Sequence, residues 1–158
     1  MPYIDWQTID DALNDDEIFL VKAHPYGKNN LYIEPSFRCI YQLDAMEPTY
    51  KYLRAADVVI TDYSSIMFDA YLLGKPVVLF EKESGYVQQR GMYMHYPGEY
   101  SYRYENNEYD LIQRTRISVY SNNSFIEQKC VDYVAGMCDG YSCKRISRFI
   151  MEVNNNEE

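Results

Sequence analysis

The stretch from residue 57 to 80, DVVITDYSSIMFDAYLLGKPVVLF, constrains the fold more than any other part of the chain. It begins with an apolar strand, Val58–Ile60, and a polar elbow, Thr61–Ser65. A predicted helix, Ile66–Leu73, and a second apolar strand, Val77–Phe80, follow. Strands joined through a helix in this way form a right-handed crossover in a parallel sheet. We therefore predict an α/β fold with a Rossmann-like parallel sheet flanked by helices.

The flanking segments continue the α/β pattern, with a long irregular stretch at Glu81–Tyr104. A polar tail at 154–158 lies outside the expected single domain, 1–153. Three or four strands are few for a Rossmann-like half, and the chain starts on a helix. We therefore expect an excised piece of a larger protein, which lacks at least one first strand of this sheet. The expected helices and strands are Asp5–Leu13, Ile18–Ala23, Cys39–Leu43, Glu47–Ala56, Asn107–Val119, Ser124–Ala135 and Tyr141–Val153, with core positions at Tyr50, Leu53, Arg54, Leu111, Ile112 and Ile117.

Composition excludes several classes of function. The formal charge of −9, from 15 basic and 24 acidic residues, argues against nucleic acid or anionic lipid as a partner of the whole surface. No apolar run approaches the roughly 20 residues of a membrane span. The start of the chain does not resemble a secretory signal, so we expect a cytoplasmic location. The four cysteines lack zinc-ligand spacing, which predicts reduced thiols and no metal site.

The polar elbow is the first candidate site. Thr61, Asp62, Ser64 and Ser65 follow an apolar strand and open a helix. Open parallel sheets bind ligands at the carboxyl ends of their strands, and free N–H groups at a helix start favour anions. The serine hydroxyls could therefore donate to a phosphate. The alternative is that Asp62 and Ser64 only cap the helix, because such caps are common.

The His24-Pro25 pair is the second candidate. We expect the strand that His24 ends to lie beside Val58–Ile60, which would bring His24 and the two elbow serines into one crevice. The imidazole could donate to a phosphate oxygen or take part in proton transfer. Lys22 should face the same side of the strand and add positive charge. The alternative is a histidine that caps a turn and a lysine exposed to solvent.

Two further segments could contact an anion. Arg90 is followed by Gly91, and its guanidinium suits bidentate contact with phosphate. Asp139 and Gly140 form a turn signal before the last helix, where another helix start could bind an anion. The alternatives are a surface arginine and plain helix capping.

Four motifs together resemble one enzyme family. The run ADVVITDYSSIMFDAYLLGKPVVLFEKESGYVQQRGMY, the earlier KAHP and the later DGYSCKRI are similar to the C-terminal domain of the CDP-glycerol glycerophosphotransferases, the teichoic-acid primases and polymerases. The resemblance covers roughly Glu17 to Ile150. It implies a GT-B fold, of which this chain would be the C-terminal, donor-binding half.

The resemblance also implies a reaction. An acceptor hydroxyl would attack the β-phosphorus of CDP-glycerol, and CMP would leave. The matching motifs imply that His24 is the catalytic group and also helps to hold the donor. The donor-binding residues that they imply are His24, Thr61, Asp62, Ser64, Ser65, Arg90, Asp139 and Gly140. No cofactor beyond the donor is implied. The polymer or lipid-linked acceptor would meet the missing N-terminal half, and through that half the full-length protein could be peripheral at the inner face of the membrane.

The chain departs from the family pattern after RGMY, where His95-Tyr96-Pro97-Gly98 replaces a longer, acidic stretch. Without the N-terminal half we expect the isolated chain to be inactive. Two other interpretations stay open. One is the donor domain of another GT-B transferase that uses CDP-ribitol or a nucleotide sugar. The other is a non-catalytic interaction module that binds through the tyrosine-rich stretch Tyr86–Tyr109.

Overall fold

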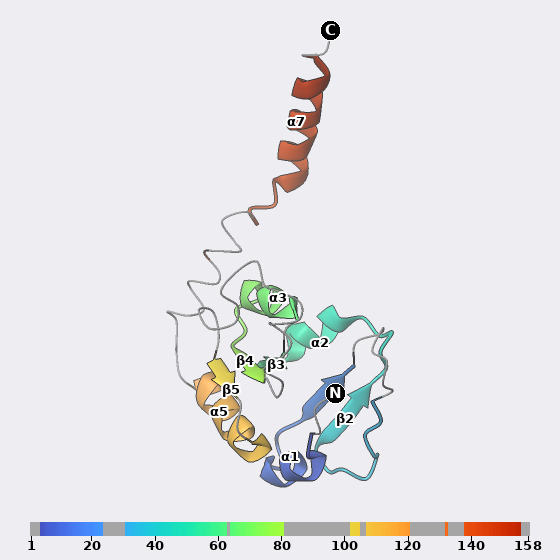
Figure 1. The fold of residues 1–158 in the computed structure, drawn as a ribbon, viewed down its shortest axis with the longest axis vertical. Helices are drawn as coiled ribbons and strands as arrows, with labels where there is room; N and C mark the ends of the chain where they lie inside the picture. Colours follow the sequence, from blue (N-terminus) through green and yellow to red (C-terminus); the bar gives the residue numbers. More distant parts are fainter. Residues whose placement is uncertain are drawn as a thin grey trace, which may run out of the picture.

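The computed structural model describes residues 4–23, 31–62, 64–80, 102–104, 107–120, 132 and 138–155. Within them, helices and strands alternate for most of the chain (Figure 1). The strands are β1 (Phe19–Lys22), β2 (Ile40–Leu43), β3 (Val59–Thr61), β4 (Val77–Phe80) and β5 (Tyr102–Tyr104). The helices are α1 (Trp6–Ala12), α2 (Thr49–Ala55), α3 (Ile66–Leu72), α5 (Glu108–Tyr120) and α7 (Ser142–Asn155).

Every described strand pairing is parallel. β1 pairs with β2, with Phe19 opposite Ile40. β3, β4 and β5 form a second sheet in that order, with Val59 opposite Val77 and Val78 opposite Tyr102. Parallel strands need a crossover between them, and α3 supplies it between β3 and β4. The predicted β-α-β unit is therefore confirmed, and the fold is α/β.

Helices cover both faces of the β3–β5 sheet. In β4, Val77 and Leu79 pack in one cluster with residues of α2 and α3, whereas Val78 packs with Leu111 of α5. Val77, Val78 and Leu79 are at most 2% exposed. A parallel strand covered on both faces reads as an unbroken apolar run rather than an alternating one, which is what the sequence of β4 shows.

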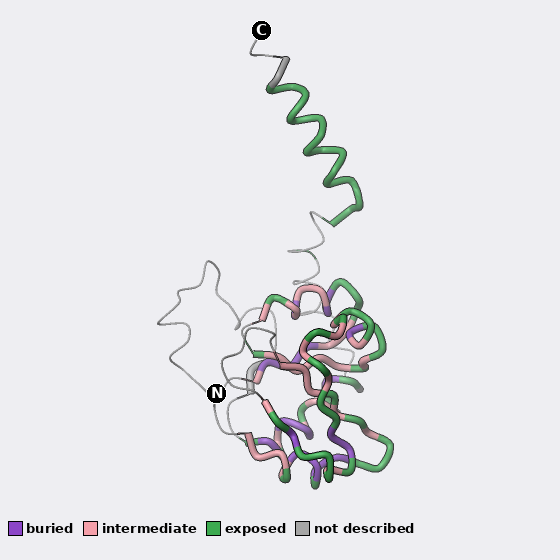
Figure 2. Tube along the Cα trace, turned by 90° about the vertical axis from the view of Figure 1, so that its right-hand side faces the viewer, coloured by how far each residue is buried: buried purple, intermediate pink, exposed green. Residues whose placement is uncertain are grey.

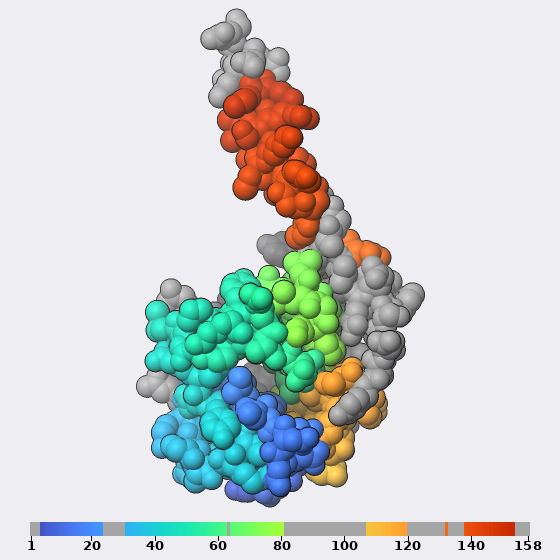
Figure 3. Space-filling view, turned by 180° about the vertical axis from the view of Figure 1, so that it is seen from behind, coloured from blue at the N-terminus to red at the C-terminus, as the bar shows by residue number. Residues whose placement is uncertain are grey.

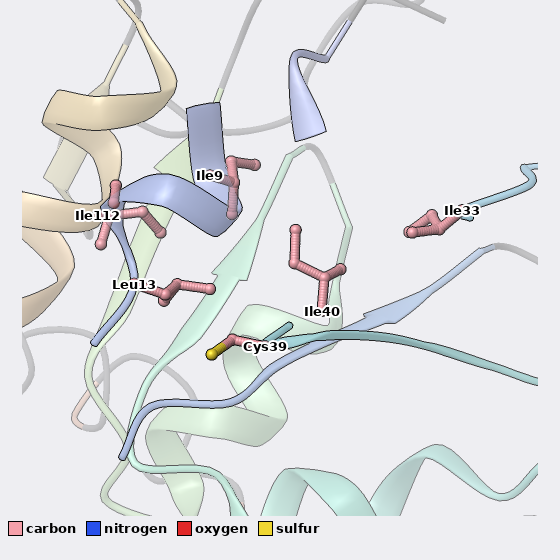
Figure 4. Packing of buried hydrophobic residues seen from close by; sticks show 7 residues of the cluster. Ile9, Leu13, Ile33, Cys39, Ile40 and Ile112 are labelled. Carbon is pink, nitrogen blue, oxygen red and sulfur yellow. The ribbon is translucent and has the colours of Figure 1, made fainter. Parts of the chain in front are cut away.

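A third cluster joins the N-terminal segment to α5. Ile9 of α1 and Leu13, which directly follows that helix, pack with Ile112 of α5 and with Ile40 of β2 (Figure 4). Buried residues concentrate in this body of the molecule, as the purple segments in Figure 2 show. The third cluster thus connects the β1–β2 pair with the helix that covers β4. Its buried members are Ile9, Ala12, Leu13, Ile33, Cys39, Ile40 and Ile112.

The last helix lies apart from this body. α7 projects away from the sheets in the ribbon and space-filling views (Figures 1 and 3). Its residues 142–153 are all exposed (Figure 2). It continues to Asn155, two residues beyond the helix end that the sequence predicts. None of the helices in the described ranges is both long and apolar enough to span a membrane.

Most of the predicted elements are confirmed, and the errors are local. The strand β5 lies within a stretch, Glu81–Tyr104, that we expected to be irregular. Tyr50, Arg54 and Ile117 are exposed rather than part of the core, since each lies on the solvent side of its helix. The expected helix Ser124–Ala135 lies outside the described residues except at position 132.

Two polar links hold α1 in place. The buried Asp10 accepts hydrogen bonds from the backbone N–H groups of Cys39 and Arg38, at 2.8 and 3.0 Å. Arg116 of α5 forms a two-point ion pair with Glu17, with N···O distances of 2.7 and 2.5 Å, and also donates to the carbonyl of Ala12. Hydrogen bonding to Arg116 holds the pKa of Glu17 below its usual 4.5. These links tie together segments that are distant in sequence.

We predict that Asp10→Ala destabilises the chain by about 2 kcal/mol, because the buried N–H of Cys39 and the partly buried N–H of Arg38 lose their acceptor. Asp10→Asn should cost less, since the amide oxygen can still accept one bond. The matched control is Asp11→Ala, at the exposed neighbouring position, which should stay within about 0.5 kcal/mol of the parent. Urea unfolding measures all three. Equal effects of Asp10→Ala and Asp11→Ala would contradict the assigned role.

The Glu17–Arg116 pair predicts a pH dependence of stability. Because the folded-state pKa of Glu17 is depressed, the pair stabilises the protein above the unfolded pKa. That contribution is lost as the pH falls from the unfolded value through the lower folded value. Glu17→Gln should therefore cost up to about 1 kcal/mol at pH 7, and its difference from the parent should vanish in acid. Thermal unfolding between pH 7 and 3 tests this, with the exposed Glu34→Gln as control. A constant difference across this range would refute it.

Candidate functional site

The elbow begins at the carboxyl end of β3. Thr61 is the last residue of the strand, and α3 starts at Ile66. Asp62 and Ser65 are exposed, whereas Thr61 and Ser64 are half-buried. The elbow therefore presents one carboxylate and several hydroxyl groups at the strand end where parallel sheets bind ligands.

Helix capping accounts for only part of this polar segment. Ser65 is the N-cap residue of α3, but its side chain makes no capping hydrogen bond. The hydroxyl of Ser64 accepts a long hydrogen bond from the N–H of Ile66, at 3.4 Å. A well-formed N-cap oxygen accepts from the second or third helical N–H at a shorter distance. Helix capping therefore explains the position of Ser64 only weakly and does not explain that of Ser65.

The helix α3, which follows the elbow, is held by its packing on the sheet and by the turn after its last residue. Met67, Ala70 and Tyr71 are buried in the cluster with β4, which seats α3 on the sheet. The helix ends at Leu72, and Gly74, just beyond it, has a φ of 67°, in the left-handed region. There the N–H of Lys75 donates to Ala70, at 2.9 Å. This stop turns the chain into β4, so both ends of the crossover are held.

Two side chains near the elbow make specific contacts. The hydroxyl of Tyr50 in α2 donates to Asp69 of α3, at 3.4 Å. Asp69, which lies inside the helix, therefore braces α3 against its neighbour. The ammonium group of Lys22 donates to the carbonyl of Ala45, beyond the end of β2. This contact directs Lys22 toward the β2 side.

The structure separates the expected site residues into three groups. Thr61, Asp62, Ser64 and Ser65 lie together in the β3–α3 connection. Asp139 and Gly140 lie at the start of α7, which projects from the body (Figure 1). His24 and Arg90 lie outside the described residues, so their expected approach to the elbow stays a prediction.

The expected pairing of the β1 strand with Val58–Ile60 is wrong. β1 pairs with β2 and β3 pairs with β4, and the two sheets are distinct among the described residues. The physical reason is the order of strands along the chain. Each of these strands pairs with the strand that follows it along the chain, β1 with β2 and β3 with β4, as consecutive strands of α/β folds usually do.

The Asp139 turn fits the structural alternative. Its carboxylate accepts from the N–H of Tyr141, at 2.9 Å, and from the guanidinium of Arg145, at 2.6 Å. The bond to Arg145 holds the pKa of Asp139 below its ordinary value. Gly140 has a φ of 80°, as a tight turn requires. These groups stabilise the start of α7.

The described residues show no cluster of three or more metal-ligating side chains. Cys39, Cys138 and Cys143 form no disulfide bond among the described residues. Sequence reasoning missed the contact of Tyr50 with Asp69, because it assigned Tyr50 to the core. The available signal was the carboxylate inside α3, which needs a polar partner when it is half-buried.

Comparisons with known proteins identify the group to which the chain belongs. The model of the CDP-glycerol:poly(glycerophosphate) glycerophosphotransferase family matches residues 1–152. The chain belongs to this family. The members of this family are transferases, and three relatives of the chain carry names that place them in teichoic acid synthesis.

Three relatives are similar in sequence to parts of the chain. A teichoic acid poly(ribitol-phosphate) polymerase of Bacillus spizizenii is 33% identical over 59% of this chain and 15% of its own length. A teichoic acid glycerol-phosphate primase of Bacillus subtilis is 32% identical over 67% of this chain and 29% of its own length. A teichoic acid glycerol-phosphate transferase of Staphylococcus aureus is 26% identical over 94% of this chain and 39% of its own length.

A solved structure confirms the fold. The wall teichoic acid polymerase TagF, solved as a variant, superimposes with a TM-score of 0.72 at 21% identity. The match covers 97% of this chain and 38% of the polymerase. The glycerophosphotransferase domain described here therefore has the α/β, GT-B-like fold expected from its sequence, and it spans well under half the length of these relatives.

Proposed function

We propose that the chain is the donor-binding domain of a glycerophosphotransferase that transfers glycerol phosphate from CDP-glycerol to a hydroxyl of a teichoic-acid-like or polysaccharide acceptor. The observation that carries the proposal is the elbow. It presents Asp62 and Ser65 at the carboxyl end of β3, in a chain that belongs to this family. A bound donor would place its pyrophosphate there, within reach of the hydroxyl groups of Ser64 and Ser65.

The chemistry asks mainly for position and charge neutralisation. The acceptor oxygen attacks the β-phosphorus, the bond from that phosphorus to the bridging oxygen breaks, and CMP leaves with that oxygen. Charge builds on the phosphoryl oxygens, and fixed donors that point at them lower the barrier. We assign this role to the elbow hydroxyls and His24, with Thr61 and Arg90 as further contacts. The base that takes the acceptor proton belongs to the other half of the enzyme.

Asp139 and Gly140 have an indirect role in this proposal. The hydrogen bonds of Asp139 to Tyr141 and Arg145 stabilise the turn before α7. A donor contact at the Asp139 turn would have to use the backbone, because the carboxylate already accepts from Arg145.

The transferred group could also be ribitol phosphate. One observation favours this second candidate: the relative with the highest identity of the three is named a poly(ribitol-phosphate) polymerase. Both donors carry the same cytidine and pyrophosphate, so the elbow would serve either. The difference must lie in the part of the pocket that meets the polyol.

The exposed face of α7 supports a two-domain arrangement. Ile146, Phe149, Ile150 and Val153 recur at helical spacing, and each is between 40% and 66% exposed. An apolar stripe of this kind is stable in water only when another surface covers it. The relatives are much longer than this chain. We assign the covering surface to the other half of the enzyme, which would also meet the acceptor and position the protein at the cytoplasmic face of the membrane.

We predict that the chain binds CDP-glycerol and that Ser64→Ala and Ser65→Ala each weaken binding about tenfold or more. Each change removes a donor to a charged phosphate, worth about 1.5–3 kcal/mol. His24→Ala should weaken binding by a similar factor. Calorimetry with CDP-glycerol and CDP-ribitol measures the effect and separates the two donors. Ser36→Ala is the control, because this serine is exposed and its hydroxyl donates to the nearby Glu34.

The outcome that would overturn the proposal is a folded protein, including its full-length form, that binds no cytidine diphosphate compound. A protein that binds UDP-sugars instead would be a different transferase. Equal binding by the parent and both serine variants would move the pyrophosphate site away from the elbow while leaving the family assignment intact.

For α7, we predict that Phe149→Ser leaves the melting temperature of this chain within about 1 °C, because the ring is exposed. In a form that contains both halves, the same change should lower the melting temperature by several degrees, because it removes buried apolar area. Ser147→Ala, on the same helix but off the apolar stripe, is the control. A large loss in this chain alone would show that α7 packs on its own domain.

A further inference from the structure

Tyr50 is exposed at the start of α2 and does not belong to the core. It is 59% exposed, whereas Tyr71 of the neighbouring helix α3 is 2% exposed and packs in a buried cluster. The same cluster contains Leu53 of α2 but not Tyr50. Leu53 therefore seats α2 on the sheet, and packing gives no reason for an aromatic ring at position 50.

The hydroxyl end of Tyr50 is tied to α3 close to the elbow. It donates to the Oδ2 atom of Asp69, at 3.4 Å. Asp69 lies four residues after Ser65, so the two side chains share one face of the helix. Helical side chains tilt toward the start of their helix, which directs the Asp69 carboxylate back over the turn that begins at Ser65. The Tyr50 hydroxyl is therefore within about one helical turn of the elbow.

The two helices lie on the same face of the β3–β5 sheet. One cluster joins Leu53 of α2 with Met67 and Ala70 of α3, and the helices lie side by side in the ribbon view (Figure 1). α3 begins directly after the carboxyl end of β3, and Tyr50 is the second residue of α2. The contact with Asp69 thus brings the first turn of α2 beside the polar elbow.

Polar contacts hold the segment that leads into α2. The ammonium group of Lys22 donates to the carbonyl of Ala45, and Glu47 pairs with Lys51, at 2.6 Å, and accepts from the hydroxyl of Tyr52. Hydrogen bonds from Lys51 and Tyr52 hold the pKa of Glu47 below its usual 4.5. Because this segment is already fixed, a ligand that contacts the start of α2 has little order to impose.

We propose that the exposed ring of Tyr50 is the surface on which the cytosine of the donor stacks when the pyrophosphate of the donor occupies the elbow. This inference rests on the proposed function, which places the pyrophosphate at Ser64 and Ser65. Planar bases stack on aromatic side chains, and this contact uses the face of the ring rather than hydrogen bonds. The bond to Asp69 restrains the ring while more than half of the residue stays open to solvent.

The polyol of the donor fits this ring less well than the base does. The hydroxyl groups of a polyol need hydrogen-bond partners when they leave water. The Tyr50 hydroxyl already donates to Asp69, so the residue offers a ligand mainly its ring face. In the donor, the nucleoside and the polyol lie on opposite sides of the pyrophosphate. A base on Tyr50 therefore directs the polyol away from α2, and the residues that distinguish glycerol from ribitol would lie elsewhere.

The test uses three ligands that contain different parts of the donor: CDP-glycerol, CDP and inorganic pyrophosphate. Tyr50→Ala removes the ring, and Tyr50→Phe keeps the ring but removes the hydroxyl. Tyr41→Ala is the matched control, because Tyr41 of β2 is 51% exposed and its hydroxyl also donates over 3.4 Å, to the carbonyl of Arg38. Calorimetry measures the affinities. The upfield shift of the cytosine ring protons in NMR spectra reports stacking itself.

We expect Tyr50→Ala to weaken the binding of CDP-glycerol and of CDP by the same factor, about tenfold or more, and to leave pyrophosphate binding unchanged. Tyr50→Phe should bind both cytidine compounds within about threefold of the parent, because only a long hydrogen bond is lost. It should keep the upfield shift that Tyr50→Ala loses. Tyr41→Ala should behave as the parent does.

Three results would overturn the inference while leaving the proposed function in place, since the parent still binds CDP-glycerol in each. In the first, Tyr50→Ala binds CDP as tightly as the parent. In the second, it loses pyrophosphate binding by the same factor, which would show that Tyr50 acts on the elbow through Asp69. In the third, only CDP-glycerol binding falls, which would place the polyol on the ring. A folded parent that binds no cytidine diphosphate compound overturns both proposals.

Discussion

The parallel ladder between β3 and β4 determines where the rest of the described structure can lie. It joins Val59 to Val77 and places the elbow at the carboxyl end of a strand whose neighbour is buried on both faces. The short crossover through α3 is possible only because Gly74 ends that helix in the left-handed region and returns the chain at once. If this ladder were lost, Thr61, Ser64 and Ser65 would no longer share one edge of the sheet.

The parts of the fold that depend on local pattern could be predicted from the sequence. The strand β4 forms at the apolar run of the sequence, and Leu111 and Ile112 are buried as predicted. The same reasoning predicts Tyr50 and Ile117 in the core, but both are exposed. Periodicity predicts that a helix is present more reliably than it predicts which of its side chains are buried. β5 was missed because a strand of 3 residues has too little pattern to stand out.

Contacts between segments that are distant in sequence could not be predicted from local sequence patterns. Asp10 meets Cys39 across 29 positions, and Arg116 meets Glu17 across 99. Nothing in the neighbouring residues distinguishes Asp10 from the exposed Asp11.

The Asp139 turn and the elbow could each either cap a helix or bind an anion, and their hydrogen bonds differ. At Asp139 the carboxylate is engaged by Tyr141 and Arg145, which is what a structural turn requires. At the elbow, Ser65 occupies the cap position without a capping bond, and Ser64 accepts from the N–H of Ile66 at 3.4 Å. The exposed hydroxyl of Ser65 is therefore placed at a helix start without serving as its cap. In a glycerophosphotransferase domain, the group that most needs such donors is the pyrophosphate of the donor.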